Sequence, residues 1–145
     1  MNNLMLVLLM ACGGVAIALQ PSINARLAQK VGSFESSLIS FAVGTLCLLA
    51  VVLTTGRGSL RGVVDASWWE LTGGFLGAFF VTMTIIAVPR MGTAAVMAII
   101  IAGQLSTGTL LDHLGMFGLR QVPLTPLRGV GIALLCLGAA LVVRR

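Results

Sequence analysis

The sequence predicts an all-α membrane protein with five transmembrane helices, and composition and run length carry this prediction. Of the 145 residues, 58% are hydrophobic and 9% are charged, with a mean hydropathy of +1.08. A soluble domain has about a quarter charged residues. The apolar residues fall in five runs near the ~20 residues that a helix needs to cross a hydrocarbon core of ~30 Å. No room is left for a soluble domain, so residues 1–145 are expected to form a single transmembrane domain.

The expected spans follow from apolar runs and helix-ending residues. They cover residues 4–29, 34–55, 68–88, 93–111 and 127–143. The first is predicted to kink at Pro21, because proline lacks an N–H and frees the carbonyl one turn back. Ser67 can cap the third span, and Glu70 lies in its first turn, where the helix dipole favours a negative charge. Pro89 is expected to end that span, and the short link to Gly92 predicts an antiparallel hairpin.

Several function classes are disfavoured by the residue pattern. The net charge of +5 comes from single basic residues spread over the loops, which does not suggest nucleic-acid binding. Cys12, Cys47 and Cys136 lie inside apolar spans, without a second cysteine or a histidine at metal-ligand spacing. No nucleophile–base set, phosphate loop or cofactor motif is visible. We therefore expect no enzyme activity, no cofactor and no metal.

Basic residues are nearly balanced across the membrane. With five spans, one side holds Arg57, Arg61, Arg120 and Arg128, and the other holds Arg26, Lys30, Arg90, Arg144 and Arg145, a tally of 4 against 5. Orientation follows the excess of Lys and Arg in short cytoplasmic loops, and almost no excess exists here. The chain is therefore expected to insert both ways up and to form an antiparallel homodimer. The alternative is one fixed orientation, with a paralogue supplying the other half of a heterodimer.

Polar residues within the spans are the candidates for substrate binding. Gln20 precedes the break at Pro21, Asn24 lies one turn later on the same helical face, and Gln104 is near the middle of the fourth span. Such residues are costly in lipid and therefore point to function, although interhelical hydrogen bonding is the competing explanation. Ser40 and Thr107 complete the set, and for both a bond to the backbone of their own helix is the favoured interpretation.

Charged residues near the span ends are candidates for coupling or gating. Asp112 and His113 end the fourth span and could form a proton-coupling pair, or they could simply begin an interfacial loop. Arg26 could attract or screen charge at the mouth of a transport path. Glu35 is expected to serve the dipole of the second helix or to pair with Arg26 or Lys30. No span has a carboxylate near its middle, which argues against a driving site built on a buried acid.

Several motifs together resemble the YdcZ-type family of the drug/metabolite transporter superfamily. The resemblance rests on Gln20-Pro21, Asn24–Leu27, Gly32-Ser33, Ser40-Phe41, Gly44-Thr45, Gly73-Gly74, Gly77-Ala78, Val88-Pro89, Gly92, Gly103-Gln104, Asp112-His113 and Gly115. It implies a bacterial inner-membrane half-transporter of five spans, since larger members of the superfamily have ten spans in two inverted halves. The related small multidrug resistance proteins use a glutamate in the first helix. Here that helix has no acid, and its candidate binding positions are the amides Gln20 and Asn24, which argues against proton-coupled cation export.

The function predicted from these features is secondary transport. A small metabolite or drug-like compound would cross the cytoplasmic membrane by alternating access. Because the first helix has no acid, a neutral or zwitterionic metabolite, or a site completed by loop charges, fits at least as well as a cation. The partners implied are this substrate, the lipid bilayer and a second, inverted chain. A non-transporting scaffold or sensor subunit is the alternative, and a channel is a third option.

Overall fold

Five helices long and apolar enough to cross a membrane make up most of the residues that the computed structural model describes, 2–56, 58–118 and 120–144. The helices are α1 (Asn3–Val31), α2 (Ser33–Thr55), α3 (Thr72–Met91), α4 (Thr93–Leu114) and α5 (Pro126–Val143), with short 3-10 turns at Leu60–Asp65, Trp68–Leu71 and Met116–Gly118. The prediction of an all-α chain with five spans is confirmed. Arg57 and Arg145, which enter the charge tally, lie outside the described residues.

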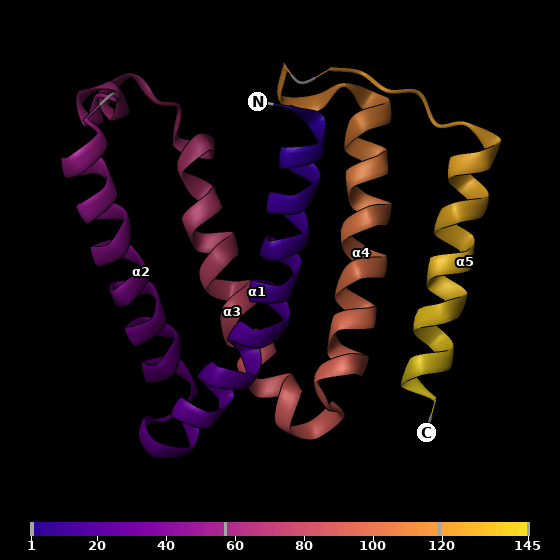
Figure 1. Ribbon diagram of the computed structural model, residues 1–145, viewed down its shortest axis with the longest axis horizontal. Coiled ribbons are helices and arrows are strands. Elements are labelled where there is room, and N and C mark those ends of the chain that lie inside the picture. The colour runs from indigo at the N-terminus through magenta and orange to yellow at the C-terminus, as the bar shows by residue number, and fades with distance from the viewer. Residues whose placement is uncertain (1, 57, 119, 145) are drawn as a thin grey trace. The chain divides into compact units, whose positions relative to one another are not determined.

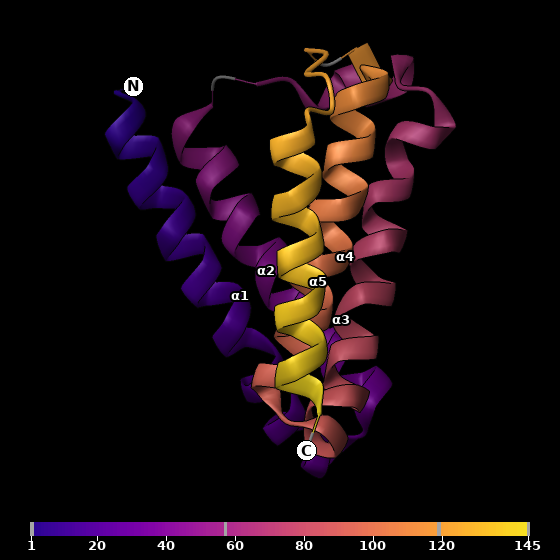
Figure 2. The same ribbon diagram turned by 90° about the vertical axis from the view of Figure 1, so that its right-hand side faces the viewer.

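Two units make up the chain, residues 1–90 and 91–145, and each is described by itself. In the first unit, α1 packs against α2, and α3 completes the group. Figures 1 and 2 show these three helices converging at the end where α1 turns into α2 and spreading apart toward the other end. In the second unit, α4 and α5 pack side by side as a hairpin.

Pro21 lies inside α1, which stays helical from Asn3 to Val31. Figure 1 shows the axis of α1 changing direction along its course, toward the start of α2. The single residue Gly32 separates the two helices, with φ +102°, a value that L side chains rarely adopt. A Cβ at Gly32 would also collide with the Glu35 carboxylate. The expected break at Gly32-Ser33 is therefore one residue long.

The expected end of the third span at Pro89 is wrong, because α3 continues through Pro89 to Met91. Proline in the last turn deprives the carbonyl of Ile85 of an N–H donor, but its fixed φ fits the helix. Gly92, with φ +84°, ends the helix instead and connects it directly to α4. At the other end, Trp68–Leu71 form a 3-10 turn before α3, and the Glu70 carboxylate accepts a 2.7 Å hydrogen bond from the Ser67 N–H.

A small polar core holds the first unit together where its helices converge. The Ser36 hydroxyl, with 0% exposure, donates a 2.8 Å hydrogen bond to the backbone carbonyl of Asn24. The hydroxyls of Ser37 and Thr82 lie 2.8 Å apart and join α2 to α3. Ile85 of α3, with 1% exposure, is among the most buried apolar side chains of this unit. Hydrogen bonds and close approach of small residues are the forces that join helices in lipid, where burial of apolar surface gives little.

Candidate functional site

A groove between α1 and α2 contains two of the predicted substrate residues. It has a volume of about 210 Å³ and is lined by Gln20, Ser40, Phe41, Gly44, Thr45 and Leu48. The Gln20 amide and the Thr45 hydroxyl have no hydrogen-bond partner among the described residues, and both are exposed. Unpaired polar groups in a membrane span are costly unless water, a ligand or another chain meets them. The groove therefore offers a donor and an acceptor to a molecule entering from the side of α1 and α2.

The α2 wall of the groove follows from helical spacing, because residues four apart lie on the same side of a helix. Ser40 and Gly44 lie on one helical row, and Phe41 and Thr45 lie on the next. The resemblance pointed to Gly44 and Thr45 only as parts of a motif, and Phe41 and Thr45 were absent from the predicted site. The i, i+4 spacing from Ser40 is the signal that could have found them.

Asn24 is buried and does not line this groove, but it bonds to Ser40, which does. Asn24 is 6% exposed, and its side-chain Nδ2 donates a 3.1 Å hydrogen bond to the Ser40 Oγ. The backbone carbonyl of Asn24 accepts a hydrogen bond from the Ser36 hydroxyl. Asn24 thus connects α1 to α2 through two hydrogen bonds. Interhelical hydrogen bonding, the competing explanation for this residue, is therefore present beside the Gln20 groove.

Phe41 connects the groove to α3. A Cβ added at Gly77 of α3 would lie 3.4 Å from the Cζ of Phe41, so the bare backbone of Gly77 faces the ring. Gly73 and Gly74, earlier on α3, have open space in the same position. The ring that lines the groove therefore rests on a single glycine of the neighbouring helix.

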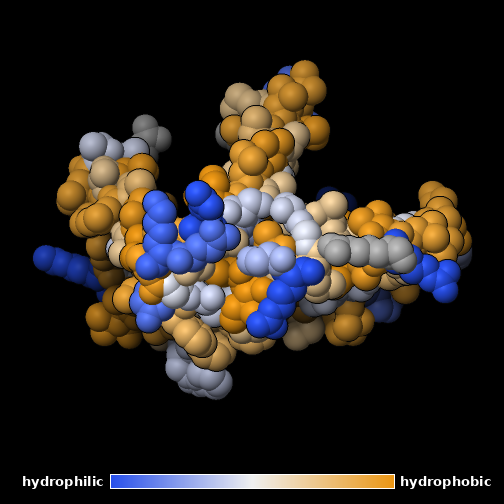
Figure 3. All heavy atoms as spheres, turned by 90° about the horizontal axis from the view of Figure 1, so that it is seen from below, coloured by the Kyte–Doolittle hydropathy of each residue, from blue (hydrophilic) through white to orange (hydrophobic). Residues whose placement is uncertain are grey.

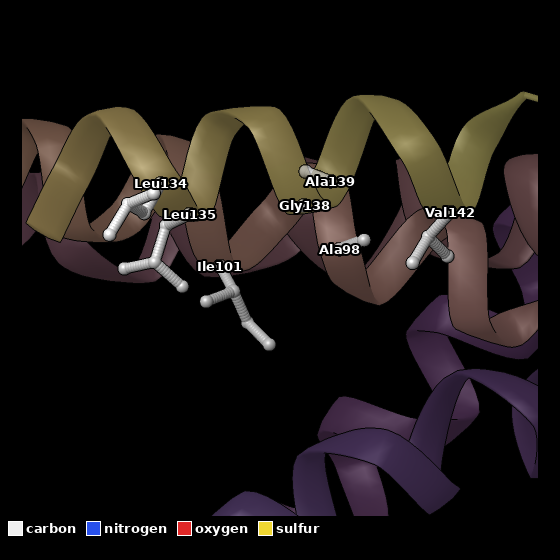
Figure 4. Close-up of a pocket in the computed structure, with 7 residues that line it drawn as sticks. All are labelled: Ala98, Ile101, Leu134, Leu135, Gly138, Ala139 and Val142. Atoms are coloured by element: carbon white, nitrogen blue, oxygen red, sulfur yellow. The ribbon is translucent and has the colours of Figure 1, made fainter.

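Gln104 and Thr107 lie on α4 in the second unit, and both are exposed without a hydrogen-bond partner among the described residues. The hydroxyl of Ser106, between them, bonds to the carbonyl of Ala102 in its own helix. A shallow cavity runs along the seam of α4 and α5, lined by the seven residues in Figure 4, Ala98, Ile101, Leu134, Leu135, Gly138, Ala139 and Val142. It has no polar side chain, and neither Gln104 nor Thr107 lines it.

Asp112 and His113 contact the loop that leads into α5. The Asp112 Oδ2 lies 3.4 Å from the Arg128 Nη2, an exposed ion pair. The His113 Nδ1 accepts a 3.2 Å hydrogen bond from the backbone N–H of Leu124, and its carbonyl accepts a 2.8 Å bond from the Gln121 amide. These contacts agree with the alternative of an interfacial loop start. The coupling role of the pair stays a prediction.

Arg26 donates a 3.1 Å hydrogen bond to the Gln29 side chain on the exposed surface of α1. Among the residues that the structure describes, Glu35 forms no ion pair with Arg26 or Lys30. Glu35 does lie in the first turn of α2, where the helix dipole favours its negative charge. Of the two expectations for Glu35, its position fits the dipole role, and no ion pair with Arg26 or Lys30 is seen among the described residues.

Residues 5–141 match the family described as "Putative inner membrane exporter, YdcZ". The chain belongs to this family. It is 31% identical over 152 residues to the inner membrane protein YdcZ of Escherichia coli strain K12, an alignment that covers 100% of this chain and 99% of the relative. No solved structure matches.

Membership of the YdcZ family and the five apolar helices together place the chain in the inner membrane as a multi-pass protein. The match spans α1 to α5 and therefore covers residues of both units. The resemblance noted from short motifs in the sequence is confirmed.

Proposed function

We propose that this protein is a small secondary transporter that exports a small metabolite or drug-like compound by alternating access. The family description as an exporter supports the reaction class. The observation that carries the proposal is the groove beside Gln20, where an amide and a hydroxyl inside membrane-spanning helices have no partner among the described residues. Intramembrane polar residues usually mark a substrate path.

The chemistry of the groove favours an uncharged or zwitterionic substrate. Its lining has an amide, two hydroxyls, an aromatic ring and aliphatic carbon, but no charged side chain. A glutamine can donate and accept at once, and Phe41 can lie against a flat apolar group. A cation would find no counter-charge there, in keeping with the absence of an acid from α1.

The proposal includes an inverted pair of chains. The groove beside Gln20 is built from two helices of one chain, and many transporters place their site between two repeats of opposite orientation. The near-equal distribution of Lys and Arg would allow the same sequence to supply both halves. In such a pair, Asn24 and Gln104 are proposed as further substrate contacts, with Arg26, Asp112 and His113 at the mouths.

Replacement of Gln20 by alanine is expected to weaken substrate binding about tenfold, because one or two hydrogen bonds of ~1 kcal/mol each are lost. Purified protein would be screened by thermal shift against metabolites and organic cations, and hits would be tested for flux in proteoliposomes. Gln29→Ala on the same helix is the matched control, since its side chain bonds Arg26 outside the groove. A scaffold would show no ligand-dependent stabilisation, and a hit unaffected by Gln20→Ala would contradict this site.

Both orientations of the chain are expected in one membrane. C-terminal fusions to alkaline phosphatase, active outside, and to a fluorescent protein, fluorescent inside, should both give signal. Arg61→Gln removes a charge from the side with four, so it should favour the fluorescent fusion, and Arg90→Gln should shift the balance the opposite way. A signal from one fusion alone, unmoved by either change, would contradict dual topology.

A further inference from the structure

A second groove opens where the three helices of the first unit converge, and it shares no lining residue with the groove beside Gln20. It has a volume of about 470 Å³ and is formed by the end of α1, the start of α2 and the end of α3. Its lining consists of Ala25, Ala28, Gln29, Ser33, Phe34, Ile85, Ile86, Pro89 and Arg90. Polar and charged groups thus border a wall of aliphatic and aromatic carbon.

The single charge in this groove is positive and unpaired. Arg90 is exposed, and its guanidinium makes no hydrogen bond or ion pair with any residue that the structure describes. Arg26 and Lys30, on the last turns of α1, add positive charge to the same end, while Glu35 is the acidic residue there. The local charge is therefore positive, and Figure 3, which views the molecule from below, shows hydrophilic side chains among hydrophobic ones on this face.

Neutral hydrogen-bonding groups complete the lining. Ser33 offers a hydroxyl and Gln29 an amide. Both groups can donate and accept hydrogen bonds, so the lining has acceptors as well as the donors of Arg90. A ligand that fits must bring a negative group for Arg90, a hydrogen-bond donor for Ser33 or Gln29, and a flexible apolar part for Phe34 and Ile86.

We propose that this groove binds the headgroup of an anionic phospholipid, with the phosphate at Arg90 and an acyl chain along Phe34 and Ile86. The groove lies at the end of membrane-spanning helices, where headgroups meet the hydrocarbon core. Basic pockets between transmembrane helices bind anionic headgroups. Phosphatidylglycerol supplies both a phosphate and hydroxyl donors, whereas phosphatidylcholine supplies a phosphate that is neutralised by its own cation and has no donor. This inference does not depend on the proposed transport function.

The test is lipid binding to the purified full-length protein in detergent, measured by native mass spectrometry with phosphatidylglycerol and phosphatidylcholine of the same acyl chains. Wild-type protein should bind phosphatidylglycerol more tightly, and Arg90→Gln should weaken that binding about fivefold, the effect of one basic residue at a membrane surface. Arg61→Gln is the matched control, because it removes an equal charge from an exposed arginine in the 3-10 turn Leu60–Asp65. Its binding should equal that of the wild type.

A second variant keeps the charge and fills the space. Ala28→Leu adds three carbons to the groove wall and should reduce phosphatidylglycerol binding with Arg90 intact. An equal loss from Arg61→Gln, or equal binding of the two lipids, would overturn the proposal. Competition by inorganic phosphate or glycerol phosphate as strong as by the lipid would overturn the acyl-chain half of it. Circular dichroism and a single elution peak would establish that each variant is folded.

Discussion

Replacement of Ser36 by leucine is expected to destabilise the protein more than any other single change considered. Ser36 has 0% exposure, and its hydroxyl donates to the Asn24 carbonyl, a contact that joins α2 to α1. Overpacking of a filled helix contact lowers the free energy of unfolding by ~1–3 kcal/mol, and loss of the hydrogen bond lowers it by a further ~1 kcal/mol. Leucine would also force α1 away from α2 and separate Gln20 from the groove wall. The free energy of unfolding in detergent, followed by circular dichroism, measures the effect.

Two control variants separate the causes of that loss. Ser36→Ala removes only the hydroxyl and should cost about 0.6–1 kcal/mol, the range for a hydrogen bond between membrane helices. Ala42→Leu adds at least as much bulk at an exposed position of α2 and should leave stability nearly unchanged. If Ser36→Leu were as stable as Ala42→Leu, that result would contradict a close contact between α1 and α2 at Ser36.

Replacement of Gly77 by valine is expected to close the groove beside Gln20 from a different helix. Alanine should be tolerated there, because its Cβ would lie 3.4 Å from the Phe41 ring, an ordinary contact distance. The two further methyl groups of valine require the ring to move away from α3, and the groove is the space that Phe41 borders on its other side. Opening the groove would then press the ring back against valine, and a clash of ~1.4 kcal/mol or more in that open state lowers access at least about tenfold.

This effect can be measured without knowing the substrate. Thr45→Cys places a thiol in the groove, in a background where Cys12, Cys47 and Cys136 are replaced by serine, since all three are exposed. Gly77→Val should slow maleimide labelling of that thiol about tenfold, by the energy above. Gly73→Val, on the same helix with open space around it, should leave the rate unchanged. Equal rates in the Gly77 and Gly73 variants would show that Phe41 does not control the groove.

Sequence alone determined the class of this protein and most of its helix boundaries. Hydropathy and run length are local properties, so the five spans could be placed within a few residues of the observed helices. The main error was the end of the third span, because proline in a last turn forfeits only one hydrogen bond. Gly92, with its positive φ, is the residue that ends α3. Family membership could also be predicted, since the motifs extend over the whole chain.

Tertiary structure decided which polar residues meet. Gln20 and Ser40 were predicted separately, but Phe41, Thr45 and Gly77 join them only through the way α1, α2 and α3 are rotated. In a soluble protein an amphipathic pattern would reveal that rotation. Here the lipid-facing and helix-facing sides are both apolar, so the pattern carries little information. The rotation depends on small residues and hydrogen bonds such as Asn24 to Ser40, which exist only once the helices have come together.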